Sequence, residues 1–258
     1  MAYQSSTLKF IAIGFVFAFL TNLPFYGWIF NKDFPNFING FPIGWLGAAM
    51  RYMATFFHEI GHTVFMWFFG YPTIPVFDFA HGGGMAVAIT GQQIPILLAV
   101  WAGLAYLFYL AKEYISARII IVAIFLFNIT FAFNEYHAVI LDFAGPALEC
   151  LFAGFFLYRC LLDLAPRGAF ERFLNAYFGI GMIMQVFING YVLIMSKAYR
   201  LVYYQQKGAH GFGDFDKIAE RLNFLDFNGV VYAWLILNFI CIMIPLYAYI
   251  NERTYQRL

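Results

Sequence analysis

A segment of mostly apolar residues near the start of the chain contains three groups that bind protons or metal ions. The stretch FFHEIGHTVF, residues 56–65, places His58, Glu59 and His62 in the pattern H-E-x-x-H. Residues four apart in a helix lie one turn apart on one face, so the two imidazoles can occupy two corners of a zinc tetrahedron. Zinc lowers the pKa of a bound water to about 7, and a carboxylate at Glu59 can accept its proton. The pattern therefore predicts Zn²⁺ as the cofactor.

The apolar surroundings of this pentapeptide strengthen the prediction of a metal. An ionisable side chain in the middle of a bilayer costs about 3 kcal/mol on insertion scales. Three such side chains within five residues need a strong interaction that stabilises them, and zinc coordination supplies one. The alternatives are a chance match, a buried polar network without metal, and a transporter or channel in which these groups relay protons or ions.

A zinc site needs a third protein ligand, which must come from another segment. The candidates at membrane depth are His81, Glu135, His137, Asp142 and Glu149. Asp142 is preferred because it is the only carboxylate in VILDFAG and because its segment is expected to return to the side where the H-E-x-x-H helix ends. The alternative for Asp142 is the N-cap of the next helix. Glu149 is interpreted as an ion-pair partner, for example of Arg51.

The composition is that of a membrane protein. Of the 258 residues, 63% are hydrophobic and 11% are charged, whereas a soluble domain has about 25% charged residues. The net charge of +1 provides no basic surface for nucleic acid. Cys150, Cys160 and Cys241 all lie in apolar stretches and are predicted to be small buried hydrophobes. Charged side chains are absent from 10–31, 60–77, 79–111, 119–134, 173–196 and 227–251.

These charge-free stretches predict the fold class, because about 20 apolar residues in a helix cross a bilayer core of about 30 Å. We expect an all-α polytopic membrane protein with about six to seven transmembrane helices and a short β-hairpin after the H-E-x-x-H helix. The predicted helices lie near 9–30, 42–69, 93–112, 117–133, 146–164, 170–196 and 228–250. The first of them is too long for a cleavable signal peptide.

Residues 71–91 interrupt the helical pattern. Two β-prone pieces, TIPVFDF and MAVAIT, flank the triplet Gly82, Gly83 and Gly84. This pattern predicts a hairpin at or inside the membrane face. The alternative is a plain linker with a flexible turn.

Three regions are expected along the chain. Residues 1–41 form an N-terminal transmembrane helix and loop, and residues 42–146 form a three-helix core that contains the hairpin. Residues 147–258 form the C-terminal transmembrane helices, with a polar loop at 197–227 in which GAHGFGDF is a flexible turn. The Lys and Arg residues divide six against eight between the two sides of such a topology, which leaves the orientation open.

The motifs resemble the site-2 protease family of intramembrane zinc metalloproteases. That family pairs HExxH with a distal N-x-x-P-x-P-x-L-D-G segment, and here Asn134 precedes Leu141 and Asp142 with the same eight-residue offset between Asn and Asp. The resemblance covers roughly residues 42–146. The prolines of the family segment are missing, and Phe143 stands in place of its glycine.

The resemblance implies a function and assigns roles to the residues. His58, His62 and Asp142 would hold zinc, and Glu59 would be the general base. Asn134 would stabilise the oxyanion or the substrate backbone, its alternative being a helix-end cap or an interhelical hydrogen bond. The chain is expected to hydrolyse a peptide bond in or near a transmembrane segment of a partner protein.

Further expectations concern the substrate and the membrane. An edge of the hairpin would hold the substrate in an extended form, with Gly82, Gly83 and Gly84 allowing close approach. The resemblance also places the N-terminus and the catalytic opening on the cytoplasmic side of an integral, multi-pass protein. The main alternative is a non-catalytic scaffold subunit of a larger membrane complex.

Overall fold

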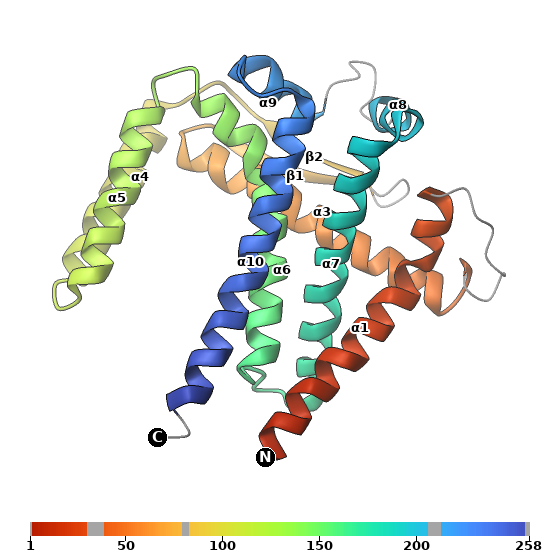
Figure 1. The fold of residues 1–258 in the computed structure, drawn as a ribbon. Coiled ribbons are helices and arrows are strands. Elements are labelled where there is room, and N and C mark those ends of the chain that lie inside the picture. The colour runs from red at the N-terminus through yellow and green to blue at the C-terminus, as the bar shows by residue number, and fades with distance from the viewer. Residues whose placement is uncertain (1, 30–38, 79–82, 206–212, 256–258) are drawn as a thin grey trace.

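The structure is a computed structural model that describes residues 2–29, 39–78, 83–205 and 213–255, and it is mostly helical (Figure 1). Its elements in chain order are α1 (Ala2–Ile29), α3 (Ile43–Phe68), β1 (Thr73–Asp78), β2 (Gly83–Ala88), α4 (Ile94–Leu110), α5 (Ile115–Phe131), α6 (His137–Leu161), α7 (Ala169–Met195), α8 (Lys197–Gln205), α9 (Asp214–Leu222) and α10 (Phe227–Tyr255). The predicted fold class, a helical membrane-type protein with a small hairpin, is confirmed.

Four long helices, α1, α6, α7 and α10, run beside one another, and α3 crosses α1, α6 and α7 (Figure 1). Helices α4 and α5 form an antiparallel pair to one side. Both chain ends lie at one end of the long helices, and α8 and α9 lie at the other.

Within the described ranges, four helical segments are long and apolar enough to cross a membrane: Thr7–Gly27, His137–Leu161, Ala169–Met195 and Phe227–Glu252. The predicted count of six to seven spans is not reached. The segments near 93–112 and 117–133 form α4 and α5, whose 17 residues each reach about 25 Å at 1.5 Å per residue, short of a bilayer core of about 30 Å. Helix α3 has the length, but its histidines, glutamate and arginine lower its apolar character.

Helix α6 is continuous where the sequence predicts a break at Gly145-Pro146. Proline removes one helical hydrogen bond but is tolerated in membrane helices when neighbours satisfy the freed groups. The carbonyl that Pro146 frees is that of Asp142, four residues earlier. Beside it, the indole Nε1–H of Trp234 donates to the Pro146 carbonyl at 3.2 Å and ties α10 to α6. The expected boundary between residues 146 and 147 therefore falls inside one helix, and Asp142 lies within that helix instead of ending a separate one.

Helices α3 and α6 cross at very close range, which is possible because glycines lie at the contact. A Cβ at Gly61 would lie 2.4 Å from the Ala144 carbonyl oxygen, and a Cβ at Gly145 would lie 2.3 Å from His62 Nε2. Small residues at helix crossings let backbones approach in this way. This contact holds the H-E-x-x-H face of α3 directly against α6.

The remaining core follows the expectations for a helical membrane protein. Cys150, Cys160 and Cys241 are free thiols and are buried, as predicted. Polar side chains join the helices across the core: Gln185 Nε2–H donates to Asn22 Oδ1 at 2.7 Å, which links α7 to α1.

The predicted hairpin is present. Strands β1 and β2 pair antiparallel from Thr73 opposite Ala88 to Asp78 opposite Gly83. Strand β2 begins two residues before the predicted MAVAIT piece, so Gly83 and Gly84 belong to it. Both strands lie against α3. His81 and Gly82 are outside the described residues.

Candidate metal centre

Helix α3 presents His58 and His62 on one face, as the four-residue spacing requires. Their Nε2 atoms lie 3.2 Å apart. Both side chains are only partly exposed, 22% for His58 and 12% for His62. The pair therefore supplies two of the four ligands that a tetrahedral metal ion needs, and water can still reach both side chains.

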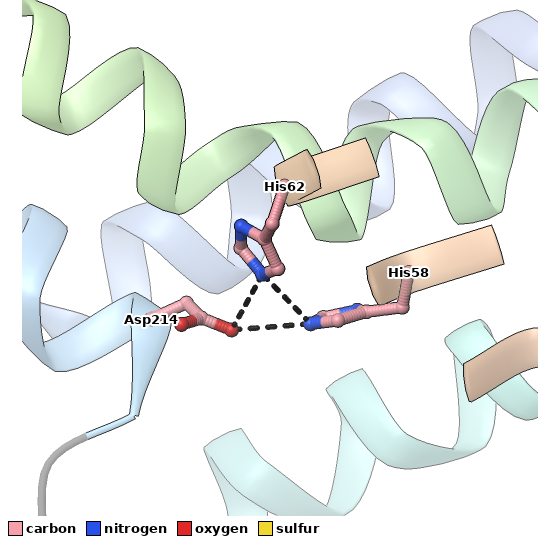
Figure 2. Close-up of side chains that lie close together, drawn as sticks. All are labelled: His58, His62 and Asp214. Atoms are coloured by element: carbon pink, nitrogen blue, oxygen red, sulfur yellow. Dashed lines mark hydrogen bonds and ion pairs between the residues drawn. The ribbon is translucent and has the colours of Figure 1, made fainter. Parts of the chain in front are cut away.

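The third group comes from α9. Asp214, the first residue of that helix, places its Oδ2 atom 3.2 Å from His58 Nε2 and 3.5 Å from His62 Nε2 (Figure 2). Among the described residues, His58, His62 and Asp214 form the group whose ligand atoms all lie within 4.8 Å of one another. Two segments that are 152 or more residues apart in the chain therefore meet at one point.

The spacing of these three atoms fits a tetrahedral ion. The edge of a tetrahedron is about 1.63 times the metal–ligand distance, so Zn–N and Zn–O bonds of about 2.0–2.1 Å need ligand atoms about 3.3–3.4 Å apart. The measured edges are 3.2, 3.2 and 3.5 Å. An octahedral ion with bonds of similar length needs adjacent ligands about 2.9 Å apart. Imidazole nitrogen also favours zinc over calcium or magnesium.

Neighbouring groups orient both imidazoles. His62 Nδ1–H donates to the Leu141 carbonyl oxygen at 2.7 Å. This bond leaves the Nε2 lone pair of His62 directed toward the triangle of candidate ligand atoms formed by His58, His62 and Asp214. His58 Nδ1 lies 3.7 Å from Glu149 Oε2. Metal-binding histidines usually contact a carbonyl or carboxylate through the second nitrogen, because this contact fixes the ring and raises its basicity. Glu149 is therefore paired with a histidine of the site, whereas Arg51 lies over the ring of Phe25.

Asp142 is not a member of the triangle, and its role changes accordingly. Its carboxylate forms an ion pair with Arg221 of α9. Phe215 and Ile218, on the same helix, are buried, and the Phe215 ring packs on Trp234 of α10 at 5.1 Å. Asp142 thus helps to hold the helix that delivers Asp214, and Asp214 replaces it as the third candidate ligand.

The two histidines favour the ionised form of Asp214. Burial favours the neutral acid, but the hydrogen bonds and charges of His58 and His62 outweigh it and hold the pKa of Asp214 well below its ordinary value. Lys217 Nζ lies 3.7 Å from the second carboxylate oxygen, Oδ1.

Glu59 and the hairpin lie against each other. Glu59 is buried, with 6% of its surface exposed. A Cβ at Gly84 would lie 2.5 Å from Glu59 Cγ and 3.1 Å from its Oε1, whereas a Cβ at Gly83 would meet nothing within 4 Å. The backbone of β2 therefore passes directly over the Glu59 side chain, and only glycine at position 84 allows this.

Asn134 lies in the turn between α5 and α6 and is not brought to the triangle. Its Nδ2–H donates to the Thr130 carbonyl at 2.8 Å, and its Oδ1 accepts from the Tyr136 amide at 2.9 Å. His137 Nδ1–H donates to the Asn134 carbonyl, and its Nε2 accepts from the Tyr71 hydroxyl at 2.8 Å. These two bonds of the Asn134 side chain are those of the helix-end cap that was its alternative, and the oxyanion role stays a prediction.

Sequence reasoning missed Asp214 because it interpreted 197–227 as a polar loop. One signal was present: Phe215, Ile218 and Leu222 recur at the helical spacing of three and four residues after Gly213. That pattern indicates a short amphipathic helix that packs on the bundle, and its first residue is Asp214. The first five residues of GAHGFGDF, 208–212, lie outside the described residues.

Comparisons with known proteins give no match: no family model, no curated protein and no solved structure matches this chain.

Proposed function

We propose that this chain is a zinc metalloprotease that hydrolyses a peptide bond in or near the transmembrane segment of a partner protein. One observation carries the proposal: two imidazoles of an H-E-x-x-H helix and a distant carboxylate lie at tetrahedral spacing, 3.2–3.5 Å apart. Three protein ligands leave the fourth position open, which is typical of catalytic zinc and not of structural zinc. The motif resembles that of the site-2 protease family.

Each residue has a defined task in this proposal. His58, His62 and Asp214 would hold Zn²⁺, which when bound supplies a Lewis acid and lowers the pKa of a coordinated water to about 7. The Glu59 carboxylate accepts a proton from the attacking water and then donates it to the leaving amine. Glu149 and the Leu141 carbonyl keep the two imidazoles in position.

The hairpin suggests how the substrate is held. A peptide bond inside a helix is shielded, so a membrane segment must be extended before it is cut. A strand that pairs with the hairpin presents its backbone beside β2, which passes over Glu59. The proposal includes a multi-pass arrangement of the four apolar helices.

Metal removal tests the proposal. We expect the protein purified in detergent to contain about one zinc per chain and to cleave a substrate membrane segment. Treatment with 1,10-phenanthroline should abolish cleavage, because Glu59 alone does not polarise the carbonyl, and added zinc should restore it. Zinc content below one ion for every few chains, unchanged in a His58→Ala variant, would favour a proton or ion transporter instead.

A matched pair of glycine variants tests the position of Glu59. Gly84→Ala places a methyl group where the Glu59 side chain lies, so we expect a loss of turnover of about 10- to 100-fold, because an error of about 1 Å in a catalytic group has effects of this size. Gly103→Ala, on α4 with open space around it and away from the hairpin, is the control. Equal turnover in the two variants would show that β2 does not position Glu59.

A further inference from the structure

An apolar cavity lies among helices that include the two carrying the candidate metal ligands, α3 and α9. Its volume is about 400 Å³, and every side chain that lines it is apolar. Helices α3, α5, α6, α9 and α10 all contribute to its wall. The residues that matter for its position are Phe65, Ile140, Ala144, Ala147, Ile218 and Ala233.

On three helices the cavity lies about one turn from a residue of the metal site. Phe65 follows His62 by three positions on α3, and Ile218 follows Asp214 by four on α9. On α6, Ala144 adjoins Gly145, against which the His62 ring rests. One turn of helix is about 5.4 Å, so the cavity begins within one side-chain length of the triangle.

Helix α9 belongs to both features. Its first residue, Asp214, supplies the carboxylate of the triangle, and Ile218 and Leu222 line the cavity. The helix is held from the outside by the ion pair between Arg221 and Asp142. Because Asp214 and these two lining residues lie on the same helix, α9 fixes the distance between the third candidate ligand and the cavity wall.

We infer that this cavity is a specificity pocket that takes a large apolar side chain, of leucine or phenylalanine size, next to the scissile bond. The inference rests on the proposed function. A peptide whose carbonyl lies at the triangle has side chains about 3.3 Å further along in either direction, within reach of the cavity. Polar side chains are rejected, because the wall offers them no hydrogen-bonding partner and burying them unpaired is unfavourable.

Small metal-binding probes test the pocket without a known substrate. Acetohydroxamic acid, 4-methylpentanohydroxamic acid and the non-chelating 4-methylpentanamide are titrated into the zinc-loaded full chain by calorimetry in detergent. Burial of each added methylene is worth about fourfold in affinity, so the branched hydroxamate should bind at least about tenfold more tightly than acetohydroxamic acid. The amide should bind far more weakly, because it lacks the chelating group.

Variants that fill the pocket provide the decisive comparison. Ala147→Phe on α6 and Ala233→Phe on α10 should each reduce the tenfold preference to within about twofold while acetohydroxamic acid binds as before. Ala105→Phe, on the exposed face of α4, makes the same change away from the cavity and should keep the preference.

The outcomes separate the two proposals. If zinc and acetohydroxamic acid bind but the preference is absent or survives in both filled variants, the pocket assignment is overturned and the proposed function stands. If the amide binds as tightly as its hydroxamate, the cavity takes apolar chains, such as those of lipids, independently of the metal, and the assignment is again overturned. A chain that binds no zinc at all overturns both.

Discussion

The Asp214→Ala variant is expected to lose its bound zinc, with an affinity lowered by more than about 100-fold. Removing even a group that only orients a zinc ligand lowers affinity about 10- to 100-fold, and Asp214 supplies one of the three ligand atoms directly. The two imidazoles that remain on α3 leave the ion with two protein ligands. The measurement is zinc per chain by mass spectrometry of the metal in protein purified in detergent under one fixed zinc supply.

Asp142 supplies the matched control, because the sequence predicts it as the ligand and the structure gives it another role. Asp142→Asn removes the charge that pairs with Arg221 but leaves the triangle, so zinc should be retained with a smaller loss of affinity. The double exchange of Asp142→Arg with Arg221→Asp should recover that loss by restoring the pair in reverse. Zinc lost in Asp142→Asn and kept in Asp214→Ala would reverse the assignment.

The Glu59→Gln variant is expected to keep its zinc and to lose peptide-bond hydrolysis by about 10²- to 10⁴-fold, the range that a positioned general base contributes. Glutamine preserves the shape of the buried side chain and its packing on Gly84 but cannot accept the proton. Membrane fractions of cells that express the wild type or the variant are compared by labelling new N-termini, which reveals the cleaved partners.

The same comparison addresses the scaffold alternative. If the partner's fragments are identical in the two strains, while His58→Ala disrupts an assembly that contains this chain, the zinc site serves a structure and not a reaction. The absence of prolines from 134–142 is compatible with either role, because residues 137–142 of this segment already belong to the helix α6.

Much of the architecture could be predicted from local patterns. The charge-free stretches indicated the apolar helices, although not how many of them are long enough to cross a bilayer. The alternating, glycine-flanked pieces after the H-E-x-x-H helix indicated the hairpin, and the structure pairs them with a shift of two residues in the start of β2. Local rules failed at Pro146, because α6 accommodates this proline in mid-helix where α3, α7 and α10 pack against it, and packing between distant segments is not visible in the local sequence.

The sequence by itself determined that His58 and His62 share one helical face, because four-residue spacing in a helix leaves no other arrangement. It also predicted that a metal ion bound by these two histidines would need an additional ligand from elsewhere in the chain. Which carboxylate would arrive was decided by tertiary structure alone, since the packing of α9 on α6 and α10 brings Asp214 in and turns Asp142 toward Arg221. Local spacing governs neighbours within a helix, whereas contacts between distant segments depend on how whole helices pack.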